Sequence, residues 1–207
     1  MEKTPILAIM YDFDHTLSPR DMQEYGFIPD LGMEADVFWN KCLKAMKRNQ
    51  MDQILAYMYM MLEEAKGKLI VNRNMLRALG KDVQLFDGVS DWFARVNEYA
   101  RSRGLQPEHY IISSGLKEII EGTEIAHEFR KIYACSFLYD VDGIAYWPAV
   151  AVNYTSKTQF LFRVNKGVLD VTEHRALNEF MPEEKRRVPF SNMIYVGDGL
   201  TAVPSMK

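Results

Sequence analysis

The stretch Ile6-Leu-Ala-Ile-Met-Tyr-Asp-Phe-Asp-His-Thr-Leu17 decides the fold class of this 207-residue chain. Its first six residues form an unbroken apolar run, which is typical of a strand buried on both faces of a parallel sheet. Three further short apolar runs, at 110–112, 133–138 and 193–196, alternate with segments of helical periodicity. Strands that alternate with helices predict an α/β fold built on a doubly wound parallel sheet.

A long segment of residues 18–84 separates the first predicted strand from the next strand-and-helix unit. Its residues 17–33 are rich in Gly and Pro and read as irregular turns, whereas 35–66 has apolar residues at helical spacing. Several of these apolar residues are methionines. We interpret the Met-rich stripe as internal packing of a helical insertion, and contact with a substrate is the alternative.

Helices are also predicted at 89–100, from 116 onward and at 156–163, and Asp140–Gly143 predicts a hairpin turn into a strand at 144–147. The charged run 173–187 is typical of a solvated helix or loop.

Composition excludes several classes of protein. The 25 basic and 28 acidic residues leave a net charge of −3, and the hydrophobic fraction is 48%, as in ordinary globular proteins. This mildly acidic chain lacks the basic surface that non-specific nucleic-acid binding needs. Cys42 and Cys135 are far apart and form no metal-binding pair, which favours a reducing, cytoplasmic location. No apolar run is long enough to span a membrane, and 5–11 is too short for a signal peptide.

Polar residues follow three of the predicted strands. Asp12 and Asp14 follow the first, Ser113-Ser114-Gly115 the second, and Gly197-Asp198-Gly199 the last. Because the carboxyl ends of parallel strands meet at one edge of a sheet, we expect the three carboxylates to converge there. A bound cation would remove their mutual repulsion, and hard carboxylate oxygens indicate Mg²⁺.

The Asp-x-Asp spacing permits a division of labour between two carboxylates on one side of the chain. One can attack a phosphorus atom and form an aspartyl phosphate, while the other protonates the leaving alkoxide and later activates water. A hydroxyl such as that of Ser113 and a cation such as Lys157 can hold the phosphate oxygens.

These motifs resemble those of the haloacid dehalogenase-like (HAD) superfamily. Asp12-Phe-Asp-His-Thr16 is similar to its DxDxT motif, the strand ending in Ser113 to its second motif, Lys157 to its third, and Gly197-Asp-Gly-Leu-Thr201 to its GDGxT motif. All four occur in the family's order and span 6–204, and the phosphoserine-phosphatase-like branch is the nearest likeness. The resemblance implies a Rossmann-like core of residues 1–17 and 85–207, and a helical cap domain of residues 18–84.

The resemblance also implies a role for each motif residue. Asp12 would be the nucleophile and Asp14 the acid/base. Ser113, with Ser114 as the alternative, and Lys157 would bind phosphate, and Thr16 would support the loop around it. Mg²⁺ would be held by Asp12, the backbone carbonyl of Asp14, and Asp198. The cap would close over the site and exclude water.

We therefore expect a Mg²⁺-dependent phosphatase acting on a small phosphorylated metabolite. A phosphotransferase or mutase on the same scaffold and a non-catalytic phosphate- or metal-binding relative are the alternatives. The second of these is motivated by Ala202, which stands where the family usually has another acidic residue. Because the family's core normally continues beyond GDGxT, we also expect the chain to be part of a longer protein. Neither the oligomeric state nor the particular ester can be predicted.

Overall fold

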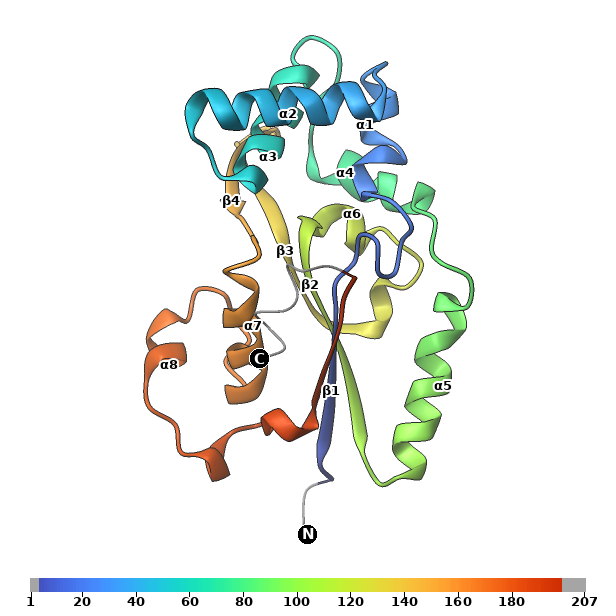
Figure 1. The fold of residues 1–207 in the computed structure, drawn as a ribbon, viewed down its shortest axis with the longest axis vertical. Coiled ribbons are helices and arrows are strands. Elements are labelled where there is room, and N and C mark those ends of the chain that lie inside the picture. The colour runs from blue at the N-terminus through green and yellow to red at the C-terminus, as the bar shows by residue number, and fades with distance from the viewer. Residues whose placement is uncertain (1–3, 199–207) are drawn as a thin grey trace.

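The computed structural model describes residues 4–198, which form a five-stranded, mostly parallel sheet with helices around it (Figure 1). The strands are β1 (Ile6–Tyr11), β2 (Gln106–Leu116), β3 (Phe129–Tyr139), β4 (Ala145–Val150) and β5 (Met193–Val196). Their order is β4-β3-β2-β1-β5, and only β4 runs antiparallel to its neighbour. The predicted α/β fold with a parallel sheet is confirmed.

The strand β1 lies between β2 and β5, and the register of the three places their carboxyl ends at one level. Tyr11 pairs with Ile111 on one side and with Val196 on the other. The backbone N–H of Asp12 also donates to the Val196 carbonyl oxygen at 2.9 Å. The polar segments that follow these strands therefore emerge at the same edge of the sheet.

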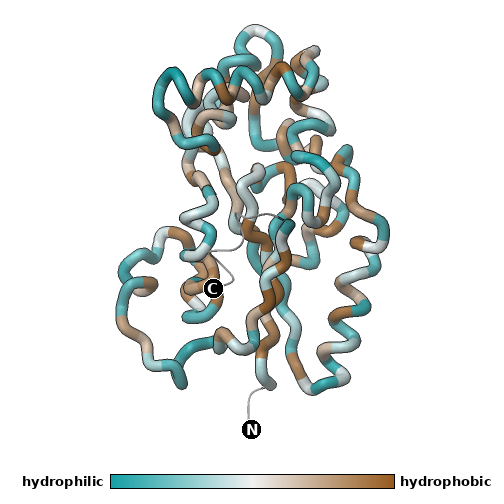
Figure 2. The backbone as a smooth tube through the Cα atoms, viewed as in Figure 1, coloured by the Kyte–Doolittle hydropathy of each residue, from teal (hydrophilic) through white to brown (hydrophobic). Residues whose placement is uncertain are grey.

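Helices cover both faces of the sheet, as a doubly wound fold requires. On one face, Phe93 of α5 (Val89–Ser102) packs edge-to-face against Tyr11 and Phe129. On the other, Phe160 of α7 (Lys157–Lys166) stacks on Tyr133 with ring centroids 4.6 Å apart. Figure 1 shows α5 and α7 on opposite sides of the strands, and the buried strands are among the most hydrophobic parts of the tube in Figure 2.

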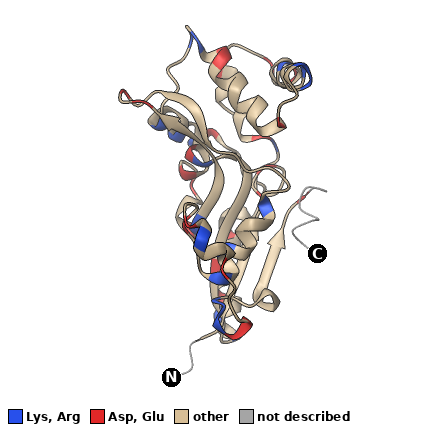
Figure 3. Ribbon diagram, turned by 90° about the vertical axis from the view of Figure 1, so that its left-hand side faces the viewer, with Lys and Arg blue, Asp and Glu red and all other residues tan. Residues whose placement is uncertain are grey.

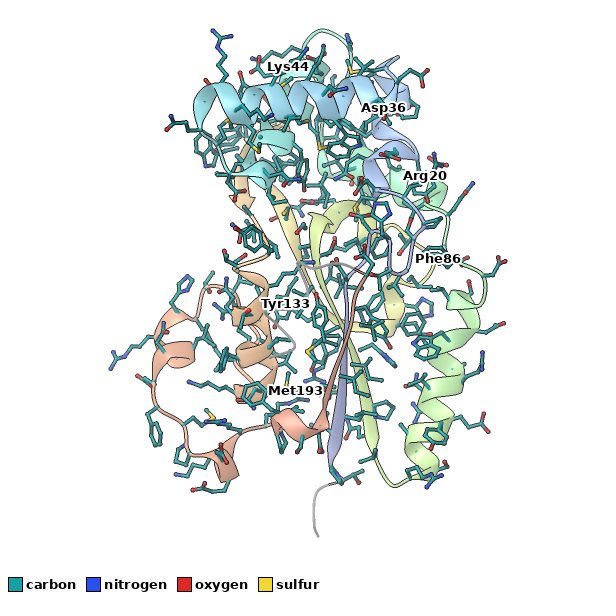
Figure 4. All side chains as sticks on the ribbon, viewed as in Figure 1. Arg20, Asp36, Lys44, Phe86, Tyr133 and Met193 are labelled. Atoms are coloured by element: carbon teal, nitrogen blue, oxygen red, sulfur yellow. The ribbon has the colours of Figure 1, made fainter. Side chains whose placement is uncertain are left out.

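The inserted segment 18–84 contributes a set of helices at the end of the molecule towards which β1 runs (Figure 1). They are η1 (Met22–Glu24), α1 (Phe27–Asp30), α2 (Ala35–Asn49), α3 (Gln53–Ala65), α4 (Arg73–Leu79) and η2 (Gly80–Asp82). The two ends of the segment meet, because the N–H of Phe86 donates to the Leu17 carbonyl oxygen at 2.9 Å. Figure 4 labels Phe86 and Arg20 where these ends enter and leave the core.

The helical pattern predicted over 35–66 is divided into two helices. Gln50 adopts the left-handed conformation with φ of 52° and ends α2. Asp52 then begins α3, since its Oδ1 accepts the N–H groups of Ile54 and Leu55. Apolar periodicity continues across this break, so it could not reveal the change of direction. The methionines of α3 pack internally, with Met58 and Met61 fully buried, which confirms that part of the stripe is core.

The predicted hairpin after β3 is confirmed and reaches the insertion. The Asp140 carboxylate accepts the N–H groups of Asp142 and Ile144 and thereby stabilises the turn. Next along the chain, the N–H of Ala145 donates to the Val71 carbonyl oxygen at 2.8 Å. The insertion therefore contacts the core through this hairpin as well as through its own two ends.

The remaining short helices are α6 (Lys117–Glu121), α8 (His174–Asn178), η3 (Ala126–Glu128), η4 (Glu183–Lys185) and η5 (Phe190–Asn192). The charged run 173–187 contains α8 and η4 and is largely exposed, as predicted. In the ribbon of Figure 3, the positions of Lys, Arg, Asp and Glu occur mostly in helices and loops. Among the helices in 4–198, none has the length and apolarity needed to cross a membrane.

Candidate active site

One pocket of about 800 Å³ brings together most of the predicted site residues. It lies between the carboxyl ends of β1 and β5, the start of α7, and helices α2 and α3 of the insertion. Of the predicted site residues it contains Asp12, Asp14, Ser114, Lys157 and Asp198. On α2, Asp36 and Lys44, both labelled in Figure 4, are exposed and do not line the pocket, while the same helix presents Trp39, Cys42, Leu43 and Met46 to it.

Asp12 and Lys157 form a buried ion pair at the base of this pocket. Asp12 is 7% exposed and Lys157 is 2% exposed. The Lys157 ammonium contacts Oδ2 of Asp12, and the backbone N–H of Phe13 donates to Oδ1 at 2.8 Å. The end of β1 positions Asp12, and the first turn of α7 positions Lys157, 145 residues later in the chain. The opposite charge of the ammonium offsets part of the cost of burying the carboxylate.

Asp14 lies two residues after Asp12 in the chain and accepts a hydrogen bond from the insertion. The backbone N–H of Met22 donates to its Oδ1 at 2.9 Å. Burial raises the pKa of the Asp14 carboxyl well above its usual range, and the nearby charge of Asp21 raises it further. A carboxyl with a raised pKa keeps its proton closer to neutral pH, which suits a general acid.

The structure distinguishes between the two serines at the end of β2. Ser114 lines the pocket, and its carbonyl oxygen accepts a hydrogen bond from the Tyr57 hydroxyl at 2.7 Å. Ser113 does not line the pocket; it is fully buried, and its hydroxyl oxygen accepts the N–H of Gly115 at 2.9 Å. Pairing of β2 with β3 changes register between Ile112 and Leu116, so simple alternation along the strand could not show which serine lines the pocket.

Thr16 also lies outside the pocket lining. It belongs to a tight turn in which the N–H groups of Thr16, Leu17 and Ser18 all point at the Phe13 carbonyl oxygen. Its hydroxyl is buried without a hydrogen-bond partner among the described residues. The preceding His15 has a left-handed φ of 58°, which reverses the chain directly after Asp14.

Asp198 ends the described part of the chain and is exposed at the pocket wall. Asp198 is close enough to affect Asp21, which also lines the pocket. Burial raises the pKa of the Asp21 carboxyl, and the negative charge of Asp198 adds to that rise. Within residues 4–198, no three Asp, Glu, His or Cys side chains are grouped closely enough to hold a metal ion. The oxygen donors that line the pocket are nonetheless the kind that Mg²⁺ binds. Gly199, Thr201 and Ala202 lie outside the described residues.

Sequence reasoning missed the part of the pocket that comes from the insertion and from the loop before α7. These residues include Asp21, Gln23, Trp39, Cys42, Met46, Asp52, Tyr57, Asn153 and Tyr154. No spacing joins them, because they meet only when the insertion folds over the sheet. Gln23 is 2% exposed, and its side-chain oxygen has no partner in the described part of the chain. For Asp52 the sequence offers only a helix-cap signal.

A second hollow, of about 910 Å³, lies between α3, the segment after it and the β3–β4 hairpin. Its wall is mainly apolar and includes Leu55, Tyr59, Ile70 and Trp147. It contains none of the predicted catalytic residues, and those that line either hollow lie in the smaller pocket.

Comparisons of the sequence identify a relative but no matching family model. A scan against models of protein families finds no match. An uncharacterized protein of Borreliella burgdorferi is 27% identical over 232 aligned positions, which cover 100% of this chain and 79% of that protein.

Solved structures give the clearest likeness. A HAD family hydrolase of Salmonella enterica serovar Typhi is similar with a TM-score of 0.62 at 15% identity, covering 98% of this chain. This chain spans only 60% of that protein's length. A substrate-bound phosphoserine phosphatase has a TM-score of 0.63 at 14% identity, covering 99% of this chain and 82% of that one. A phospho-aspartyl intermediate analogue of phosphoserine phosphatase has a TM-score of 0.56 at 14% identity, covering 98% of this chain and 82% of that one. The chain therefore has the fold of the HAD-like hydrolases, and it is similar in particular to phosphoserine phosphatases.

Proposed function

We propose that this protein is a Mg²⁺-dependent phosphomonoester hydrolase that acts through an aspartyl phosphate on Asp12. The observation that carries the proposal is the buried pair of Asp12 and Lys157 in one pocket with Asp14. The likeness in fold to phosphoserine phosphatases supports the reaction class, and the site residues support the roles.

In the first half of the reaction, an Asp12 oxygen attacks the phosphorus of the ester and the bond to the leaving oxygen breaks. Asp14 gives its proton to that oxygen, so that the product leaves as a neutral alcohol. The raised pKa of Asp14 favours this role because the proton is still present near neutral pH. Lys157 holds the phosphate oxygens and neutralises negative charge as the phosphoryl group moves onto Asp12.

In the second half, the Asp14 carboxylate removes a proton from a water molecule, and the oxygen of that water attacks the phosphorus. The bond between the phosphoryl group and Asp12 breaks, which releases inorganic phosphate and regenerates the Asp12 carboxylate. Asp14 is then protonated again, so that one water is consumed for each ester hydrolysed.

The residues that would hold Mg²⁺ are Asp12, the backbone carbonyl of Asp14, and Asp198. When bound, the metal would supply positive charge that offsets the charge of the phosphate and the neighbouring carboxylates. Because Asp12 and Asp198 line the same pocket, the donor set fits a hard cation.

The substrate would be a small phosphorylated metabolite that the 800 Å³ pocket can enclose. The insertion 18–84 would act as a cap domain, since Trp39, Met46 and Tyr57 on its helices line the wall opposite Asp12. Water exclusion by such a cap would protect the aspartyl phosphate from premature attack.

The direct test is phosphate release from a panel of small phosphate esters, with and without Mg²⁺. We expect turnover that requires Mg²⁺ and is lost in Asp12→Asn, a variant that keeps the size of the side chain. A variant with normal turnover would refute the mechanism. The matched control is Asp36→Asn, at an exposed position of α2 that does not line the pocket, which should leave the rate unchanged.

A further inference from the structure

A hydrogen bond crosses the pocket wall between the insertion and the loop before α7. The Asn153 side-chain amide donates from Nδ2 to Oδ2 of Asp52 at 3.1 Å. The two residues are 101 positions apart in the chain, and both line the candidate active site. Asp52 begins α3 of the insertion, and Asn153 lies four residues before Lys157.

The hydrogen bonds around Asn153 fix which end of its amide faces Asp52. Its Oδ1 accepts the backbone N–H of Ser156 at 2.9 Å and the hydroxyl of Thr155 at 2.8 Å. A backbone N–H can only donate, so the atom that receives it is the amide oxygen. The nitrogen is therefore the atom directed at Asp52, which makes this a bond from an amide to a carboxylate.

Asn153 also sets where α7 begins. Its backbone carbonyl oxygen accepts the N–H of Lys157 at 3.0 Å, while its side chain accepts the N–H of Ser156. Lys157 is the first residue of the helix, and its ammonium reaches Asp12 from there. A shift of Asn153 would therefore move the residue that is proposed to hold the substrate phosphate.

Asp52 divides its two carboxylate oxygens between separate tasks. Its Oδ1 accepts the N–H groups of Ile54 and Leu55 and caps α3, while Oδ2 receives the amide of Asn153. The N-terminus of a helix from the insertion is thus attached to the N-terminus of the helix that carries Lys157.

We propose that Asp52 and Asn153 form a clasp that positions Lys157 relative to the insertion and keeps the pocket closed around its substrate. This inference rests on the proposed function. Asn153 and Asp52 are positioning residues, because they act through Lys157 and the insertion and not on the reacting atoms. The clasp holds the insertion, whose residues line the pocket, over the bound ester, so its loss should weaken binding of the ester and raise KM more than it lowers kcat.

The division of tasks permits a test by exchange of the two side chains. In Asp52→Asn, the oxygen that caps α3 is kept, since Asn is as good a cap as Asp, but an amide now faces the amide of Asn153. In Asn153→Asp, the oxygen that accepts Ser156 is kept, but a carboxylate now faces Asp52. The double variant D52N/N153D restores one donor opposite one acceptor with both caps intact.

The proposal is tested by steady-state kinetics and by amide hydrogen exchange on the wild type, the two single variants and the double variant. Each single variant should raise KM for p-nitrophenyl phosphate on the order of fivefold, which corresponds to the loss of one hydrogen bond. In each, kcat should change less than about twofold. Each should also speed amide hydrogen exchange in 53–56 and in 151–156. The double variant should return both quantities to near the wild-type values.

Thr155→Val is the matched control, because it removes a hydrogen bond to Asn153 without touching Asp52. It should leave exchange in 53–56 unchanged. The clasp is refuted if the single variants behave as the wild type, or if the double variant fails to recover. If the wild type hydrolyses no ester, the proposed function fails, yet hydrogen exchange in the four proteins still decides whether the clasp exists.

Discussion

Substitution of Gly115 by Ala should displace Asp14, the proposed acid/base residue, by crowding it and its neighbour Met22. A Cβ at this position would lie 2.1 Å from Cε and 2.8 Å from Sδ of Met22, and 2.9 Å from Oδ2 of Asp14. Met22 is 1% exposed, so its side chain has no free space to enter. Its Sδ also accepts the N–H of Leu116 at 3.1 Å, and its own N–H donates to Asp14.

The expected loss of stability has two parts. Overpacking of a full core typically costs ~1–3 kcal/mol, and weakening of the hydrogen bond from Met22 to Asp14 adds ~1 kcal/mol. We therefore expect Gly115→Ala to lower the free energy of unfolding by about 2–4 kcal/mol, measured by urea denaturation. Displacement of Asp14 should also lower kcat, by up to about a hundredfold if the carboxyl moves by ~1 Å.

A double-mutant cycle with Met22→Ala separates this clash from a general effect of the alanine. Met22→Ala alone should cost about 2–5 kcal/mol because it leaves a cavity. The double variant should be destabilised by at least ~1 kcal/mol less than the sum of the single changes, since the new methyl group occupies the vacated space. Strict additivity, or a loss below ~0.5 kcal/mol in Gly115→Ala, would show that the close packing around Asp14 has been misjudged.

Three further predictions concern other groups. Asp14→Asn should slow hydrolysis of alkyl phosphates by about 10²–10⁴-fold. With p-nitrophenyl phosphate it should still release a burst of nitrophenolate, because that leaving group needs no proton. Equal slowing of both substrate types with no burst would rule out the acid role. Burial lowers the pKa of His109 from 6.5 to about 4. The unfolded chain therefore binds a proton that the folded chain does not, and stability should fall as pH drops from 6.5 towards 4, by ~1.4 kcal/mol at pH 5.5. Urea denaturation of His109→Gln should show a smaller fall over this window, and an identical pH profile in the two proteins would exclude His109 as the cause. Arg187→Met should cost about 1.5–3 kcal/mol in thermal or urea unfolding, because Glu108, with a side chain 5% exposed, loses its partner at 2.5 Å and keeps Arg130 at 3.4 Å. The pair Arg187→Met with Glu108→Gln should recover part of that loss, and no recovery would count against the ion pair as the cause.

The sequence predicted the sheet well because short-range patterns determine it. The apolar run 6–11 is β1, and the runs at 110–112, 133–138 and 193–196 lie within β2, β3 and β5. Their carboxyl ends align as parallel strands require, so Asp12 and Asp198 could be assigned to one edge before any contact was known.

The rest of the site depends on contacts between distant parts of the chain. The choice between Ser113 and Ser114 depends on a register shift in β2, which no periodicity reveals. The bond between Asp52 and Asn153 requires a particular placement of the insertion over α7. The break at Gln50 depends on one backbone angle within a continuous apolar pattern. Local preferences determine elements, whereas pockets arise from how the elements pack.

The most direct test of the central claim is detection of a phosphoryl group on Asp12 during turnover. The protein would be mixed with Mg²⁺ and an ester that it hydrolyses, quenched in acid, digested and examined by mass spectrometry. We predict a phosphorylated peptide that contains Asp12, formed only with Mg²⁺ and absent from Asp12→Asn. Turnover without that adduct, or an adduct on another residue, would contradict the mechanism. An absence of turnover across a broad panel of esters would instead favour a non-catalytic phosphate-binding protein.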